Sequence, residues 1–382
     1  MNILILGAGQ LARMMSLEGA PLNLNVRAFD VSSQKIIHPL TYQVFEQSLE
    51  QAISTVDVIT SEFEHIPDDV LALCCQSGKF HPGKAAIKTG GDRSIEKDLL
   101  DRTDVPSAPY QLITQKQHLL DAVSVLDLPL VIKTCQAGYD GKGQWRLKSL
   151  DQVESIWAEM AGFIASGTES FPHTIIAEKM IPFDREVSLI GVRDKKGNVK
   201  TYPITENQHT NGILTLSLAV KVDDNIQQQA INAFNKLAVS MDYVGVLAIE
   251  FFEVSGTLMV NEIAPRVHNS GHWTQQGTAC SQFENHLRAV TGLPLGDTRA
   301  QKPSVMINVL GQSTIPTQVL AIDDVKSHWY GKTQRTGRKM GHINVSAEDN
   351  IALGHKLLLL SEILPEQDYP GVRAMSERLL QG

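Results

Sequence analysis

Two apolar segments late in the chain, residues 247–252 and 258–263, each carry a single glutamate, Glu250 and Glu262. Both segments are typical of buried β-strands, and the short polar stretch between them favours a turn, so together they predict a β-hairpin. A carboxylate in an otherwise apolar strand is costly to bury unless a cation neutralises it. We therefore expect the two glutamates to share one face of the hairpin and to hold a hard, oxygen-seeking cation, for which magnesium is the candidate.

The length of the turn decides whether the two glutamates can face each other, because side chains alternate between the two faces of a strand. A two-residue turn would place them on opposite faces, so we predict an odd number of turn residues, Ser255, Gly256 and Thr257. The alternative is a hairpin whose two glutamates merely face water.

Length and composition narrow the possible function classes. The 382 residues, of which 42% are apolar, predict two or three domains, each with its own core. A net charge of -8 disfavours nonspecific binding to nucleic acid or to an anionic membrane, and small molecules remain the plausible partners. The four cysteines show neither metal-ligand spacing nor a disulfide framework, and no segment is typical of a signal peptide or membrane span. We expect a cytoplasmic protein.

The start of the chain is typical of an α/β domain. Residues 3–12 predict a buried strand, a glycine turn and a helix, and residues 26–30 predict the next strand. The turn resembles a dinucleotide-binding fingerprint, with Ala12 at its third glycine position and Asp30 as a candidate ribose-binding acid. A compact strand-to-helix connection without a cofactor is the favoured interpretation, and an NAD-dependent oxidoreductase is kept as an alternative from another class.

Four domains follow from the pattern of elements and breaks. Alternating strands and helices continue to a helix at 94–102, and two prolines then mark a boundary. We predict a Rossmann-like domain at 1–105, a small α+β lid at 106–185, a strand-rich domain with the glutamate hairpin at 186–302, and a small domain at 303–382. Within the last three we expect strands at 130–133, 175–178 and 305–310, and helices at 153–166, 226–241 and 351–360.

A glycine-rich loop follows the strand that ends at Lys133. Its three glycines within residues 138–144 let backbone N–H groups approach phosphate oxygens, although the loop lacks the Gly-Lys-Ser/Thr ending of a P-loop. We interpret it as a flap over phosphate, and a surface hairpin is the alternative. Residues 178–181 end a strand and offer backbone hydrogen bonds to adenine, while Glu186 is placed to accept ribose hydroxyls.

Residues 264–273 directly follow the glutamate hairpin and combine an arginine, two histidines and an asparagine. Arg266 can hold a planar oxyanion bidentately, and His268 and Asn269 can orient it. Histidine close to metal ligands also raises the possibility of zinc, but the hard carboxylate pair and the absence of thiolates favour magnesium. His272 and Trp273 are expected to pack in the core.

These features together resemble the ATP-grasp ligases and, more narrowly, the 5-(carboxyamino)imidazole ribonucleotide synthetase family. The resemblance covers nearly the whole chain, and the run at 261–273 is its most specific part. It is carried by residues 7–12, 62–64, 138–144, 185–187, 206–209, 261–273, 330–332 and 337–342.

The resemblance implies an ATP-grasp fold of α/β and α+β class, with an N-terminal Rossmann-like (pre-ATP-grasp) domain and a small C-terminal domain. It implies that ATP phosphorylates bicarbonate and that the carboxyl group passes to aminoimidazole ribonucleotide in purine biosynthesis. It also implies a homodimer. By motif position, the ATP contacts would be Arg93, Lys133, Gly138, Tyr139, Asp140, Gly141, Lys142, Gly143, Gln144, Glu178, Lys179, Met180, Ile181, Glu186, His209, Asn261 and Glu262.

The same resemblance places the other ligands. Glu250 and Glu262 would bind magnesium; Arg266, His268 and Asn269 would hold bicarbonate, with Lys133 and Asp140 counted among the catalytic groups. The imidazole nucleotide would contact Gln10, Glu64, Tyr139, Asp140, Lys332, Arg335, Arg338 and Lys339.

The sequence departs from the family pattern at Thr336, where proline is usual, and at residues 219–221, which lack the usual Ala-Pro ending. Neither position is a proposed ligand, so the departures bear on loop rigidity and leave the reaction class unchanged. Two further alternatives are a formate-dependent glycinamide ribonucleotide transformylase, which shares the architecture, and a noncatalytic nucleotide-binding regulator.

Overall fold

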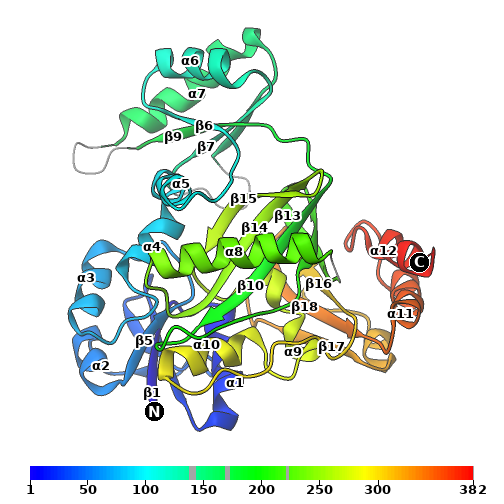
Figure 1. Cartoon of the computed structure of the whole chain (residues 1–382). Coiled ribbons are helices and arrows are strands. Elements are labelled where there is room, and N and C mark those ends of the chain that lie inside the picture. The colour runs from blue at the N-terminus through cyan, green and yellow to red at the C-terminus, as the bar shows by residue number, and fades with distance from the viewer. Residues whose placement is uncertain (137–142, 168–172, 221–222, 382) are drawn as a thin grey trace.

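The structure is a computed structural model that describes residues 1–136, 143–167, 173–220 and 223–381, organised around three β-sheets (Figure 1). Within the described residues, no helix combines the length and the apolar character that a membrane crossing requires. Of the glycine-rich flap predicted at 138–144, residues 138–142 lie outside the described residues.

The N-terminal sheet has the strand order β4-β3-β2-β1-β5, in which β1 runs parallel to both of its neighbours. Residues Ile3–Leu6 of β1 are fully buried, as expected of a central parallel strand. The elements of this region are β1 (Asn2–Leu6), α1 (Gln10–Gly19), β2 (Asn25–Asp30), β3 (Lys35–Ile37), β4 (Val44–Phe45), α2 (Leu49–Thr55), β5 (Val58–Ser61), α3 (Asp68–Gln76), α4 (Lys84–Gly91) and α5 (Arg93–Arg102).

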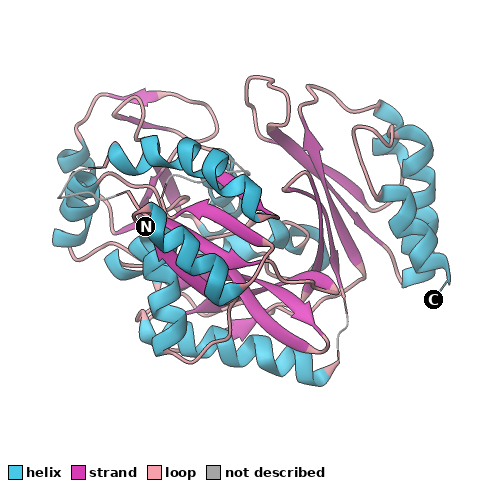
Figure 2. Ribbon diagram, turned by 90° about the horizontal axis from the view of Figure 1, so that it is seen from above, coloured by secondary structure: helices cyan, strands magenta, loops and turns pink. Residues whose placement is uncertain are grey.

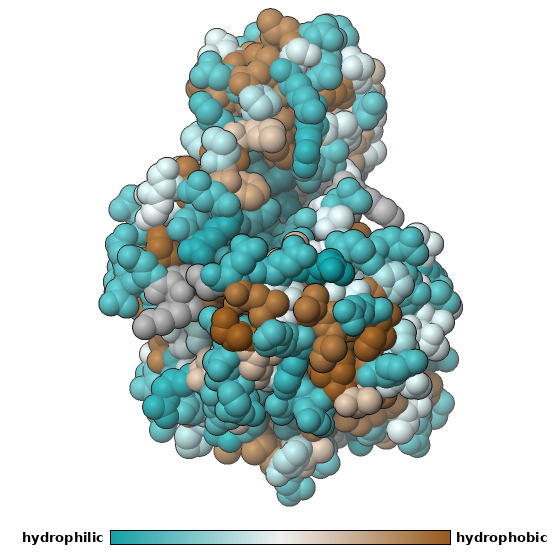
Figure 3. Space-filling model, turned by 90° about the vertical axis from the view of Figure 1, so that its right-hand side faces the viewer, coloured by the Kyte–Doolittle hydropathy of each residue, from teal (hydrophilic) through white to brown (hydrophobic). Residues whose placement is uncertain are grey.

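A four-stranded antiparallel sheet, β6-β9-β7-β8, forms a separate lobe with two helices on one face. Figure 3 shows this lobe above a narrower waist that joins it to the body of the molecule. We call the lobe the lid. Its elements are β6 (Tyr110–Ile113), α6 (Lys116–Leu126), β7 (Leu130–Thr134), β8 (Gln144–Leu147), α7 (Val153–Ala165) and β9 (Ile175–Lys179).

The third sheet has nine strands in the order β15-β14-β10-β12-β13-β16-β18-β17, with β11 paired to β10. Its elements are β10 (Arg185–Arg193), β11 (Val199–Thr201), β12 (Thr205–Thr210), β13 (Ile213–Ala219), α8 (Asp224–Ser240), β14 (Gly245–Val254), β15 (Thr257–Ala264), α9 (Thr274–Gly277), α10 (Gln282–Thr291), β16 (Ser304–Leu310), β17 (Val325–Trp329), β18 (Lys339–Ser346), α11 (Asn350–Ile363) and α12 (Val372–Gln381).

The C-terminal segment is continuous with this large sheet. Strand β16 pairs with β13, with Leu216 opposite Ile307, so the C-terminal strands extend the sheet that holds the glutamates. Helices α11 and α12 cover one face of these strands (Figure 2) through a shared apolar core that includes Leu357 and Met375. The helices predicted at 94–102, 153–166, 226–241 and 351–360 are confirmed as α5, α7, α8 and α11.

The turn of the glutamate hairpin is shorter than predicted. Val254 pairs with Thr257, so the turn has two residues, Ser255 and Gly256, and both have positive φ, which gives the twist that suits tight hairpins. A β-bulge beside Glu250 then shifts the register, so that Glu250 faces Glu262 while Phe251 faces Val260. The extra residue lies in the strand and not in the turn; the predicted cross-strand placement is confirmed and the predicted three-residue turn is wrong.

Candidate active site

The two hairpin glutamates lie in different electrostatic environments. Burial raises the pKa of Glu250 to about 7, and the negative charge of Glu262 adds to this effect. Burial also acts on Glu262, but its pKa is lowered on balance because the positive charges of Arg93, Arg266 and Lys133 outweigh it. Arg93 Nη2 lies 3.3 Å from Glu262 Oε2. Arginine therefore compensates one carboxylate and leaves the other short of positive charge.

This deficit fits a hard divalent cation. In the part of the chain that the structure describes, no group of three or more His, Cys, Asp and Glu side chains is arranged to hold a metal. Two carboxylates are therefore the available acidic ligands, and phosphate oxygens or water would complete the shell, which is the usual situation for Mg²⁺. Zinc is usually held by three or four protein ligands drawn from His, Cys, Asp and Glu, and the described residues hold no such group.

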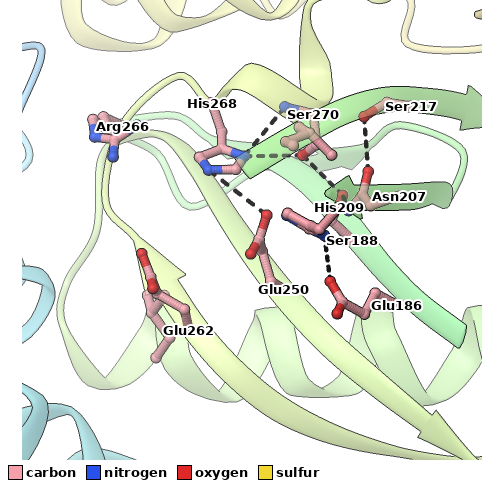
Figure 4. Close-up of polar contacts among 12 residues, drawn as sticks. Glu186, Ser188, Asn207, His209, Ser217, Glu250, Glu262, Arg266, His268 and Ser270 are labelled. Atoms are coloured by element: carbon pink, nitrogen blue, oxygen red, sulfur yellow. Dashed lines mark hydrogen bonds and ion pairs between the residues drawn. The ribbon is translucent and has the colours of Figure 1, made fainter. Parts of the chain in front are cut away.

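Glu186 and His209 form a second polar pair beside the hairpin (Figure 4). Glu186 Oε2 contacts His209 Nδ1 across strands β10 and β12. Burial lowers the pKa of His209, but the hydrogen bond to Glu186 and the charge of Glu250 outweigh it and raise the pKa overall. Both residues were predicted to bind ATP, and the structure places them together.

A cavity of about 370 Å³ opens next to this pair. Its size is within the range of small-molecule sites. The C-terminal helix α12 supplies part of its wall, which the sequence did not indicate. The cavity is lined by Phe183, Arg185, Glu186, Glu206, Asn207, Gln208, His209, Ala374, Met375 and Arg378.

The loop after β15 is held by side chains that sequence reasoning missed. Gln282, fully buried at the start of α10, accepts from the backbone N–H of His268 at 2.9 Å and donates to its carbonyl at 2.6 Å. His268 Nδ1 is 2.9 Å from the Ser270 hydroxyl, and its Nε2 is 3.8 Å from Glu250 Oε1. The imidazole is thereby fixed with one edge toward the hairpin. As expected, His272 and Trp273 are buried.

A chain of polar side chains supports this loop from the sheet. Ser188 donates to Ser270 at 2.8 Å, Asn207 donates to Ser188 at 3.0 Å, and Ser217 donates to Asn207 at 2.8 Å (Figure 4). Ser188 follows Glu186 by two positions and so shares its face of β10. That alternation of polar residues in an apolar strand was the available sequence signal.

Arg266 and Asn269 complete the loop. Arg266 Nε lies 2.6 Å from Glu64 Oε1, so residues assigned to two different substrates are in contact. Among the described residues, neither buried side-chain polar atom of Asn269 has a hydrogen-bond partner. Unpaired buried amides are costly, and a polar ligand at this position would satisfy one.

Lys133 and the strand at 175–178 meet inside the lid. Lys133 Nζ lies 2.6 Å from Glu178 Oε2. Burial raises the pKa of Glu178, but the positive charges of Lys133 and Lys97 outweigh burial and lower the pKa to about 2. The N–H groups of Lys179 and Met180 donate to the carbonyls of Pro109 and Pro129. Adenine contacts predicted for 178–181 would therefore use the carbonyls of this segment or the N–H of Ile181.

The predicted flap is only partly described. Gly138, Tyr139, Asp140, Gly141 and Lys142 lie outside the described residues. Gly143 and Gln144 lead into β8, with the Gly143 carbonyl accepting from Thr134 at 2.9 Å. The described ends show that the flap connects β7 to β8, on the strand that carries Lys133.

The basic turn predicted to bind the nucleotide phosphate connects β17 and β18. Tyr42 donates to the carbonyl of Tyr330 at 3.4 Å, so the turn adjoins the N-terminal sheet, and the charge of Lys332 acts on Glu62 there. Arg335 is exposed, and Arg338 donates to the Thr333 carbonyl at 2.9 Å. The charge of Lys339 acts on Glu250, His209 and His268, which places it toward the hairpin.

The N-terminal glycine turn is filled by a side chain of the protein. The Glu62 carboxylate accepts from the N–H of Ala12 at 2.8 Å and from that of Gly9, at the helix end where a dinucleotide phosphate would bind. A Cβ on Gly7 would lie 2.4 Å from Glu62 Cγ, so the glycine accommodates this carboxylate. Gln10 begins α1 beside it. This arrangement disfavours the oxidoreductase alternative.

Family models cover most of the chain. Residues 1–89 match the ribonucleotide synthetase preATP-grasp domain, residues 98–283 the ATP-grasp domain, and residues 304–356 the phosphoribosylaminoimidazole carboxylase C-terminal domain. The N5-carboxyaminoimidazole ribonucleotide synthase of Vibrio cholerae is 54% identical over 99% of this chain and 100% of its own length. The chain belongs to the N5-carboxyaminoimidazole ribonucleotide synthase family. It is therefore an ATP-grasp ligase, with ATP as co-substrate.

More distant members of the N5-carboxyaminoimidazole ribonucleotide synthase family also match nearly the whole chain. The Escherichia coli enzyme is 37% identical over 97% of both chains. The Thermus thermophilus crystal structure superimposes with a TM-score of 0.84, at 36% identity, over 95% of this chain and 99% of that one. The Aspergillus clavatus enzyme was solved with ADP and 5-aminoimidazole ribonucleotide. It superimposes with a TM-score of 0.78, at 28% identity, over 99% of this chain and 98% of that one.

Proposed function

We propose that this chain carboxylates 5-aminoimidazole ribonucleotide in purine biosynthesis, using ATP and bicarbonate. A bicarbonate oxygen attacks the γ-phosphorus of ATP, the bond to the β-phosphate oxygen breaks, and ADP and carboxyphosphate form. The exocyclic amine of the nucleotide then attacks the carboxyl carbon, phosphate leaves, and the amine loses a proton. The observation that carries the proposal is the glutamate hairpin beside the Arg266–Asn269 loop, in a chain with this family membership.

The ATP end of the site lies between the lid and the large sheet. Glu186 would accept the ribose hydroxyls. Lys133 and Arg93, which lie at the site in contact with Glu178 and Glu262, would meet the phosphates. When bound, magnesium at Glu250 and Glu262 would offset the charge that builds on the transferring phosphoryl group.

The bicarbonate end lies on the loop after β15. Arg266, oriented by its contact with Glu64, would bind the anion, and the unpartnered amide of Asn269 would donate to it. His268 is held neutral, because burial and the charge of Arg266 keep its pKa well below the ordinary value, and so it can donate or accept a hydrogen bond without adding charge.

The imidazole nucleotide would lie between Glu64, the N-terminal turn and the basic turn, with Lys332 and Arg338 on its phosphate. Bicarbonate is a poor nucleophile and carboxyphosphate hydrolyses readily, so orientation of the reactants and exclusion of water would supply much of the catalysis. The flap that connects β7 to β8 would exclude water when the lid closes.

The deciding experiment is ADP release with bicarbonate and aminoimidazole ribonucleotide each omitted in turn. Productive turnover should require both. Replacement of bicarbonate by formate with glycinamide ribonucleotide should give no product; if it does, the transformylase alternative is correct. A bicarbonate-independent change in nicotinamide absorbance would support the oxidoreductase, and ATP binding without any dependence of ADP release on bicarbonate would support a regulator.

The magnesium requirement, the homodimer and the cytoplasmic location belong to the same proposal. Loss of turnover with a magnesium chelator, restored by added magnesium, would support the first. Light scattering of the purified chain would test the second, and fractionation of cells that express it would test the third.

A further inference from the structure

Helix α5 presents three charged side chains on one face. Arg93, Glu96 and Lys97 are spaced i, i+3 and i+4, and such residues lie side by side on a helix. Arg93 contacts Glu262, the Glu96 carboxylate accepts from the backbone N–H of Ile263 at 2.8 Å, and Lys97 contacts Glu178. Helix α5 therefore contacts both β15, which carries the candidate metal ligand Glu262, and β9, the lid strand that carries Glu178.

Lys97 is sealed inside the protein. Its side chain is 1% exposed, and its Nζ lies 2.8 Å from Glu178 Oε1 and 5.5 Å from the centre of the Tyr110 ring. Lysine is almost never fully buried unless it is paired. A purely stabilising role explains it poorly, since a buried ion pair is often no more stabilising than apolar residues of the same shape.

The same carboxylate binds a second lysine. Glu178 Oε2 lies 2.6 Å from Lys133 Nζ, and Lys133 retains 15% exposure where Lys97 has almost none. Two ammonium groups and one carboxylate leave a net charge of +1 in this cluster. Without Lys97, the Glu178 charge would be neutralised by Lys133 alone, and the cluster would present no net charge to an anion.

We propose that Lys97 is a positioning residue for ATP: it binds one oxygen of Glu178 and so leaves the Lys133 ammonium with positive charge to attract the triphosphate. This inference rests on the proposed function for its ligand. Lys97 does not reach the nucleotide in this arrangement, because Glu178 and Tyr110 enclose its ammonium group. It acts through the charge of its neighbours.

The test uses the full-length chain and compares Lys97→Met with Lys97→Met/Glu178→Gln. The single substitution makes the cluster neutral, and the double substitution restores a net charge of +1 on Lys133. We expect Lys97→Met to raise the KM for ATP and the Kd for ATP about tenfold or more, because a charge in a water-excluded site acts strongly. The KM for aminoimidazole ribonucleotide should change less than about twofold, and the double variant should have a KM for ATP at least about threefold lower than that of Lys97→Met.

The matched control is Lys116→Met, which removes a lid lysine that is paired with Glu154 near the surface. It should leave the KM for ATP unchanged. An unaltered KM for ATP in Lys97→Met would overturn the proposal, and so would a double variant as impaired as the single one. If Lys97→Met does not fold, as judged by circular dichroism, Lys97→Gln replaces it in the same comparison: an unaltered KM for ATP overturns the proposal, and a raised KM that falls in Lys97→Gln/Glu178→Gln supports it.

These outcomes are distinct from failure of the proposed function. In that case the parent chain would release no ADP in response to bicarbonate and aminoimidazole ribonucleotide. The Kd for ATP, measured by calorimetry without either substrate, would still separate the parent from Lys97→Met.

Discussion

Gln282 offers a direct test of how the loop after β15, which carries the proposed bicarbonate ligands, is held. Its buried amide makes two hydrogen bonds to the backbone of His268, at 2.9 and 2.6 Å. Gln282→Met keeps the length of the side chain and removes both bonds, together with the 3.0 Å contact between Gln282 Nε2 and His272 Nδ1. Leaving a buried backbone group without a hydrogen bond costs about 1–3 kcal/mol. If the loop kept its position, the N–H and the carbonyl of His268 would together destabilise the folded protein by about 2–6 kcal/mol. We expect the loop to shift instead, until water reaches these groups.

Such a shift should appear in the chemical step. A misplacement of about 1 Å can lower a rate about 100-fold, so we expect kcat for bicarbonate-dependent ADP release to fall about 10- to 100-fold. The KM for ATP should stay within about twofold, because Gln282 contacts the loop that carries Asn269 and not the residues assigned to ATP. Hydrogen exchange of residues 266–272 should be faster than in the parent.

The chain contains a matched control for this substitution. Gln229 makes the same pair of backbone hydrogen bonds at the more exposed tip of the glutamate hairpin: it accepts from the N–H of Leu258 at 3.0 Å and donates to the carbonyl of Gly256 at 2.9 Å. Gln229→Met should leave kcat within about twofold, since the hairpin tip lies away from the site. If Gln282→Met also keeps a parental kcat while its loop exchanges faster, the loop geometry does not limit catalysis and the reasoning fails.

Three further predictions follow from the site. Glu262→Ala should abolish ATP cleavage, because it removes a candidate magnesium ligand and the partner of Arg93; near-normal ADP release would refute the metal assignment. Lys332→Ala should chiefly raise the KM for aminoimidazole ribonucleotide, and a rise confined to the KM for ATP would contradict its assignment to the nucleotide phosphate. Glu178 has a folded pKa of about 2 against an ordinary 4.5, which corresponds to about 3 kcal/mol of stability that is fully present above pH 4.5 and lost as the pH falls toward 2. Urea unfolding of the parent should show the free energy of unfolding falling between pH 6 and 3. A Glu178→Gln variant should be less stable than the parent at pH 6, and its free energy of unfolding should lack this contribution to the pH dependence.

The elements with strong periodicity could be predicted from the sequence. Helix α8 and the strand at 130–133 appear where their apolar patterns placed them, because local preference and tertiary packing agree there. The glutamate hairpin was predicted for a sound reason and with the wrong turn. A bulge and a longer turn both shift the register by one residue, and only the folded strands distinguish them.

Two side chains that support the site, Gln282 and Lys97, could not be identified from the sequence. Gln282 lies 14 positions after His268, and Lys97 lies 81 positions before Glu178. Each works through a contact that tertiary structure creates, so spacing along the chain carries no sign of it. A helix whose side chains contact the residues of a site has the same sequence pattern as a helix that only packs in a core.

The N-terminal glycine turn shows why a motif needs its structural context. A strand, a glycine turn and a helix form an anion site at the helix start whatever anion occupies it. In this chain the anion is the Glu62 carboxylate, which binds the N–H groups of Gly9 and Ala12 and lies within reach of the charge of Lys332. The turn thereby lies between the N-terminal sheet and the basic turn, and a side chain of the protein fills the fingerprint that suggests a dinucleotide.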